Sequence, residues 1–172
     1  GGAGARGAGV CGCAGGDSDA CVGAPASDGG TSRATRGGIG VATSHYRLGA
    51  LGVCDLASHL GDDFAACGIN GTLDQAAALR WGHENIAGFG GDPDRITIGG
   101  ESAGAFSVCN MVAMPTTNGL FPQALAPSGA AHHTLGPDDG KDLAAQFPRR
   151  LGHPSAPHPP PLPAPPPLAA PA

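Results

Sequence analysis

The residues best suited to chemistry are a serine and its small neighbours at positions 100–104, which read GESAG and fit the pattern GxSxG. A nucleophilic serine in this pattern sits on a sharp turn between a strand and a helix, so that its hydroxyl projects from the strand end. Gly100 and Gly104 leave space for the neighbouring backbone to approach closely. A helix that begins at Ala103 directs its first N–H groups at the reaction centre. The pattern therefore predicts Ser102 as the nucleophile of an acyl transfer and the Ala103 N–H as an oxyanion donor.

The surrounding sequence supplies the strand and the helix that this turn needs. Short apolar runs predict adjacent parallel strands near residues 39–44, 94–99 and 123–127. Apolar spacing and turn residues predict helices from Thr72 to the turn at residues 90–93, from 103 to about 112, and over 142–150. Thr72 and Gln75 fit a capping box at the start of the first of these helices. Strands that alternate with helices indicate an α/β fold with a mostly parallel sheet flanked by helices.

Four longer segments carry a resemblance to a known family. FGGDPDRITIGGESAG, at residues 89–104, resembles the serine-site signature of the type-B carboxylesterase (cholinesterase-like) family. HYRLGALG (45–52), LDQAAALRWGHENIAGFGGDP (73–93) and GLFPQALAPSG (119–129) resemble three further segments of that family. The resemblance runs from about residue 27 to 151. It implies a truncated fragment of an α/β-hydrolase that acts on small-molecule esters through an acyl-enzyme at Ser102, with no metal and no cofactor.

The family also has a His-Gly-Gly stretch that supplies a second oxyanion donor. In this chain the corresponding place falls at Gly15 and Gly16, and the preceding histidine is absent. The resemblance therefore implies that the N–H groups of these two glycines complete the oxyanion hole. The alternative is that residues 1–26 are unrelated to the family.

The acid and the histidine of a catalytic triad should follow the serine along the chain. In the family they lie far downstream, and the histidines at the end of this chain stand in a proline-rich segment without a scaffold to hold hydrogen-bond geometry. His132 and His133 are interpreted as surface loop residues. We therefore expect no complete triad within this chain, although formal candidates exist: Asp138, Asp139, Asp142, His153 and His158.

Composition divides the chain into three parts. Residues 1–26 form a Gly/Ala-rich low-complexity segment, and residues 153–172 hold ten prolines and no charged Asp, Glu, Lys or Arg. Such segments have little to bury, so we expect both to be disordered. All seven aromatic residues lie between Tyr46 and Phe147, so only the middle of the chain can build a core. The resemblance implies a partial carboxylesterase domain at residues 27–152.

Charge and patterning exclude several other classes of function. The net charge of −5 with a single lysine argues against nucleic-acid binding, and no apolar run approaches the ~20 residues of a membrane span. No leader of basic and then apolar residues is visible, which favours a cytoplasmic location. The six cysteines show no CxxC and are expected to be free thiols.

The alternative function is that of a non-catalytic fragment or of an interaction protein derived from this fold. The sequence contains no pattern that indicates the oligomeric state.

Overall fold

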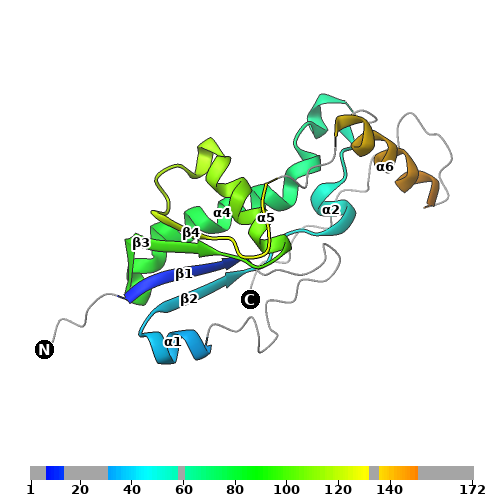
Figure 1. The fold of residues 1–172 in the computed structure, drawn as a ribbon. Coiled ribbons are helices and arrows are strands. Elements are labelled where there is room, and N and C mark those ends of the chain that lie inside the picture. The colour runs from blue at the N-terminus through cyan, green and yellow to red at the C-terminus, as the bar shows by residue number, and fades with distance from the viewer. Residues whose placement is uncertain (1–6, 14–30, 58–60, 132–135, 151–172) are drawn as a thin grey trace, which may run out of the picture.

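In the part of the chain that the structure describes, the sheet has four parallel strands. The computed structural model describes residues 7–13, 31–57, 61–131 and 136–150. The strands lie in the order β2-β1-β3-β4 (Figure 1). Their bounds are β1 (Gly7–Cys13), β2 (Gly40–Ser44), β3 (Gly91–Gly99) and β4 (Gln123–Leu125). The predicted parallel sheet with flanking helices is therefore confirmed.

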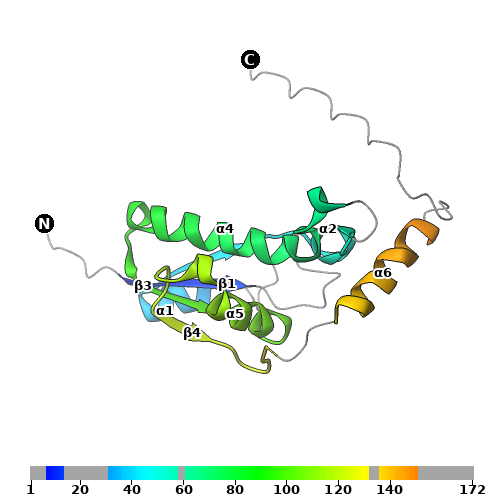
Figure 2. The same cartoon turned by 90° about the horizontal axis from the view of Figure 1, so that it is seen from above.

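Two long helices lie over one face of this sheet. These helices are α4 (Asn70–Asn85) and α5 (Ala103–Ala113), and Figure 2 shows them side by side over the strands. The remaining α-helices are α1 (Thr31–Gly37), α2 (Gly49–Val53) and α6 (Pro137–Arg150). Short 3-10 turns complete the described part: η1 (Asp62–Phe64), η2 (Cys67–Ile69), η3 (Ile86–Phe89) and η4 (Pro115–Thr117). None of these helices is both long and apolar enough to cross a bilayer.

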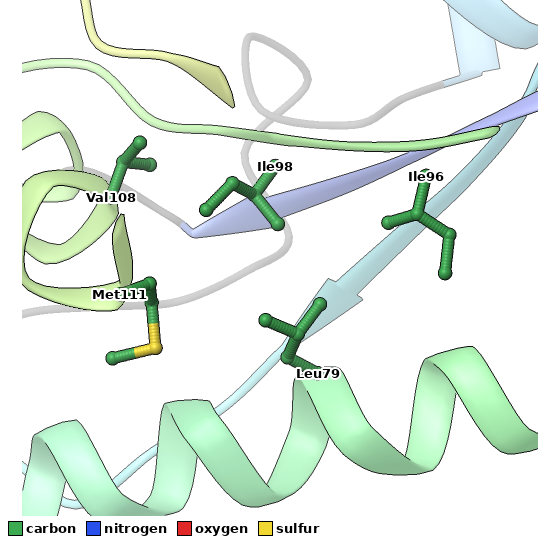
Figure 3. Close-up of a cluster of buried hydrophobic side chains, with 5 residues drawn as sticks. All are labelled: Leu79, Ile96, Ile98, Val108 and Met111. Carbon is green, nitrogen blue, oxygen red and sulfur yellow. The ribbon is translucent and has the colours of Figure 1, made fainter. Parts of the chain in front are cut away.

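The core lies between β3 and the two long helices. Figure 3 shows Ile96 and Ile98 of β3 facing Leu79 of α4 and Val108 and Met111 of α5, and all five side chains are at most 3% exposed. Aliphatic side chains thus form the core, while the aromatic rings of the domain stay nearer the surface. Because this cluster joins the strand before Ser102 to the helix after it, it positions the serine turn.

One prediction about the first part of the chain is wrong. The stretch before residue 27 was expected to lack regular structure, but Gly7–Cys13 forms β1 at an interior position of the sheet. It pairs with β2 on one side and with β3 on the other. Pairing on both edges uses backbone groups and does not require large side chains, so tertiary context overrides a glycine-rich composition.

The predicted strands near 39–44 and 94–99 are consequently separated by β1, while β3 and β4 are direct neighbours. The rest of both terminal segments lies outside the described residues.

Two helix starts also differ from the predictions. Helix α4 begins at Asn70, its N-cap residue is Ile69, and no side chain caps it. Thr72 therefore lies inside the helix, and the predicted capping box is absent.

Helix α6 begins at Pro137, five residues before the predicted start, with Asp138 and Asp139 in its first turn. Proline is well suited to the first turn of a helix because it lacks an N–H that would have no acceptor there, and acidic residues favour the same turn.

An ion pair joins two of the segments that resemble the family. The Asp74 carboxylate on α4 accepts hydrogen bonds from Arg47 Nε and Nη2, both at 2.7 Å, and from the Arg47 N–H at 3.0 Å. These hydrogen bonds lower the pKa of Asp74 and raise that of Arg47. Gly52 and Gly71 both lie against the Arg47 carbonyl, where a Cβ on Gly52 would overlap it and one on Gly71 would lie 2.7 Å from its oxygen. The turn after β2 is thus held onto the start of α4.

Candidate active site

Ser102 lies on a sharp turn between β3, which ends at Gly99, and α5, which begins at Ala103. Its backbone has φ 53° and ψ −116°, and only one other non-glycine residue in the described part has a positive φ. A side chain in this region costs about 1–3 kcal/mol of strain, which the surrounding structure must offset. The residue is exposed. The predicted strand–turn–helix geometry around Ser102 is therefore present.

Backbone hydrogen bonds hold this turn on both sides. The Gly100 N–H donates to the Leu125 carbonyl at 3.2 Å, and the Ser102 N–H donates to the Pro127 carbonyl at 3.3 Å. On the helix side, the Ala105 N–H donates to the Ser102 carbonyl at 2.9 Å. The pairing between β3 and β4 thus continues past the end of both strands and constrains the turn.

A glycine that the sequence analysis did not assign to the site packs against the turn. A Cβ on Gly129 would lie 2.6 Å from the Ala105 Cβ and 2.8 Å from the Ser102 carbonyl oxygen. Only glycine leaves space for the turn to lie this close to the segment after β4. The signal for this role was present in GLFPQALAPSG, whose last residue is Gly129.

The start of α5 gives this site its electrostatic character. The first four N–H groups of an α-helix have no acceptor within the helix, and Ala103 is the first residue of α5. In α5 the N–H groups of Gly104, Ala105 and Phe106 donate to the carbonyls of Glu101 and Ser102. The Ala103 N–H and the helix dipole therefore favour negative charge beside Ser102. The arrangement can therefore stabilise an oxyanion that forms when the serine hydroxyl attacks a carbonyl carbon.

The sheet order marks the same place as a ligand site. The chain passes from β1 to β2 on one side and then returns to β3 on the other side of β1. In open parallel sheets, ligands bind beyond the carboxyl ends of the strands where the order reverses in this way. Gly12 pairs with Gly99 in the register of β1 and β3, so the chain leaves β1 beside the serine turn. Gly15 and Gly16 follow two and three residues after Cys13 and lie outside the described residues.

Comparison with known proteins identifies the family. The sequence profile of the carboxylesterase family matches residues 18–158. The chain belongs to the carboxylesterase family. Among solved structures, the Geobacillus stearothermophilus carboxylesterase EST55 superposes on this chain with a TM-score of 0.82 at 38% identity, covering 86% of this chain and 32% of that one. The α/β-hydrolase fold is therefore established for this carboxylesterase chain.

Curated relatives of this carboxylesterase chain carry two kinds of name. The para-nitrobenzyl esterase of Bacillus subtilis is 43% identical over 123 residues, which is 72% of this chain and 24% of that protein. Human neuroligin-2, whose name refers to no hydrolysis, is 50% identical over 98 residues, which is 57% of this chain and 11% of that protein. The chain thus spans a quarter or less of the length of these curated relatives.

The structure brings none of the formal triad candidates to Ser102 among the residues it describes. Asp138, Asp139 and Asp142 are exposed on α6, where Asp138 accepts a hydrogen bond from Lys141 Nζ at 3.2 Å. Within the described ranges, no cluster of three or more His, Cys, Asp or Glu could hold a metal ion. The remaining two candidates, His153 and His158, lie outside the described residues, as do the predicted loop residues His132 and His133.

Proposed function

We propose that this chain carries the nucleophile of a carboxylic-ester hydrolase and that Ser102 is that nucleophile. The observation that carries the proposal is the strained backbone of Ser102, which places this exposed residue at the N-terminus of α5. Strain of this kind concentrates at functional sites, because ordinary packing does not require it. The esterases among the relatives and solved structures support the same reaction class.

In the proposed reaction, the Ser102 Oγ attacks the carbonyl carbon of a small-molecule ester. The carbonyl electrons move to the oxygen, and the resulting oxyanion accepts hydrogen bonds from the Ala103 N–H and from the N–H groups of Gly15 and Gly16. A base takes the proton of the Ser102 hydroxyl and gives it to the departing alcohol, and water then hydrolyses the acyl-enzyme to release the carboxylic acid and restore Ser102. The reaction needs no metal and no cofactor.

We assign no base for Ser102 among the described residues. Removal of the histidine from a serine triad lowers the rate by about 10⁴- to 10⁶-fold, so turnover alone is a poor test of the nucleophile. A fluorophosphonate probe forms a covalent bond from the serine oxygen to phosphorus and releases fluoride. It therefore reports on the nucleophile in a single event.

The test is probe labelling of the folded protein followed by peptide mapping. We expect the label on Ser102 in the wild type and no label on the Ser102→Ala variant at an unchanged unfolding midpoint. Ser128→Ala is a matched control, because Ser128 is also exposed and also has a positive φ, of 61°, but begins no helix. Labelling of Ser102→Ala at the wild-type rate would show that another residue reacts.

A non-catalytic role is the second candidate, and the similarity to neuroligin-2 favours it. In that case the fold and the turn are retained without the reaction. Folded wild-type protein that takes up no label would support this candidate and would refute the proposed hydrolysis.

A further inference from the structure

A buried amide on α4 connects that helix to the start of α5. Gln75 is 5% exposed, and its Nε2 donates a hydrogen bond to the Ser107 hydroxyl of α5 at 3.0 Å. The Ser107 hydroxyl in turn donates to the carbonyl of Ala103 at 3.2 Å. A hydroxyl can accept one hydrogen bond and donate another, so the two contacts form one continuous chain of hydrogen bonds. It runs from the middle of α4 to the first residue of α5.

This chain of hydrogen bonds ends on the residue next to the nucleophile. Ala103 is bonded to Ser102, and its N–H is the oxyanion donor of the proposed reaction. The hydrogen bonds from the β4 side reach only Gly100 and Ser102, so they hold the turn before the helix begins. The first turn of α5 therefore has its polar anchor on the opposite side, at Gln75.

We infer that Gln75 is a positioning residue for the serine site, acting through Ser107 to hold the first turn of α5 and its N–H groups in place. This inference rests on the proposed function for its catalytic meaning. Small displacements of groups that bind a transition state cost large factors in rate, about 10²-fold for 1 Å. Loss of the Gln75 amide should therefore affect reactivity more than its contribution to stability would indicate.

The opposite end of α5 offers a matched control. Thr117 is 1% exposed, and its hydroxyl hydrogen-bonds the carbonyl of Met111 in the last turn of α5 and that of Met114 just after it, the second at 2.8 Å. Thr117→Val removes a buried polar contact of α5, as Gln75→Met does, but far from Ala103. The two variants should lose similar amounts of thermal stability.

The experiment measures fluorophosphonate labelling and amide hydrogen exchange in parallel. We expect Gln75→Met to slow labelling about tenfold and Thr117→Val to change it less than about twofold. Ser107→Ala should slow labelling as Gln75→Met does. The double variant should be no slower than either single variant, because both substitutions break the same series of hydrogen bonds.

The exchange probes are the amides of Gly104 and Ala105, which donate to the carbonyls of Glu101 and Ser102 at 2.9 Å each. Their exchange should be about fivefold faster in Gln75→Met and unchanged in Thr117→Val.

The exchange measurement separates this inference from the proposed function. If the wild type takes up no label, the hydrolase proposal fails, while faster exchange confined to Gln75→Met and Ser107→Ala would still support positioning by Gln75. Unchanged exchange at Gly104 and Ala105 in Gln75→Met would overturn the inference whatever the labelling shows. Equal slowing of labelling by Gln75→Met and Thr117→Val would also overturn it, because the effect would then follow stability alone.

Discussion

The serine turn and helix α6 are held in very different ways. The turn is constrained by backbone hydrogen bonds to the β4 side, by the close contact with Gly129 and by the core beneath α5. Helix α6 lies beyond the sheet in both views, at the side to which the strands run (Figures 1 and 2). Its acidic side chains are exposed, Ala144 is its buried residue, and Gly140 lies near Asp55, where an added Cβ would be 3.9 Å from the Asp55 Cβ.

This difference shows which parts of a catalytic serine site can be encoded locally. A nucleophile turn needs one strand, one helix and the next strand of the sheet, and 39 consecutive residues from Gly91 to Gly129 contain them all. An acid and a base must approach from elsewhere in a folded scaffold. The chain spans 32% of the EST55 structure and 24% of the para-nitrobenzyl esterase.

The largest effect is expected from filling the space at Gly129. Gly129→Val would place side-chain atoms against Ala105 and the Ser102 carbonyl, and overpacking of this kind costs about 3 kcal/mol. We expect a lower unfolding midpoint and loss of probe labelling. Gly82→Ala on α4 is the control, because its Cβ would meet nothing within 4 Å and should stabilise the helix by roughly 0.5–1 kcal/mol. A Gly129→Val protein as stable and reactive as the wild type would refute the close contact.

A smaller change in stability, in the opposite direction, is expected from a substitution at Ser102, the proposed nucleophile. Ser102→Gly should raise the free energy of unfolding by about 1 kcal/mol, because glycine adopts a φ of 53° without strain. The same change should abolish labelling. Ser128→Gly should also stabilise the protein but leave labelling intact. A loss of stability in Ser102→Gly, measured by denaturant unfolding, would show that the turn is unstrained.

The ion pair between Arg47 and Asp74 should make a modest contribution to stability that depends on pH. Because Arg47 lowers the pKa of Asp74, the pair stabilises the fold above the ordinary carboxyl pKa of 3.8, and this stabilisation is lost as the pH falls through the lowered pKa. Both side chains are partly exposed, so Asp74→Asn should lower the unfolding midpoint at neutral pH by only about 1–3 °C. The difference between variant and wild type should shrink in acid. A difference that grows as the pH falls would contradict this linkage.

The smallest effect is expected on α6. Replacing Asp138, Asp139 and Asp142 together by Asn should leave the rate of probe labelling within about twofold of wild type, because none of the three is hydrogen-bonded to Ser102 or a histidine in the described part. The unfolding midpoint serves as the control for helix stability. A large loss of labelling at an unchanged midpoint would identify one of these residues as the triad acid. Helix α6 would then belong to the same site as the serine turn.

Much of this architecture was predictable from local patterns. The strand before Ser102 and the helix after it follow from a compact apolar run, a glycine-rich turn and an unbroken helical stretch. Strand β1 was not predictable in this way, because GAGVCGC has one large aliphatic residue and derives its place from hydrogen bonds on both edges. The start of α4 was missed because Thr72 and Gln75 fit a capping pattern, whereas Gln75 turns towards Ser107 of α5.

Local sequence patterns are sufficient to identify the nucleophile candidate and the elements on either side of it. These depend on short-range preferences: where glycine is required, where a helix can begin and which residues favour strands. Three further contacts are visible in the folded chain alone: β1 lies beside β3, Gly129 packs on the serine turn, and Gln75 reaches the start of α5 through Ser107. Each of these contacts joins residues more than twenty positions apart, and such pairs are selected by how the whole sheet and its helices pack rather than by any local pattern.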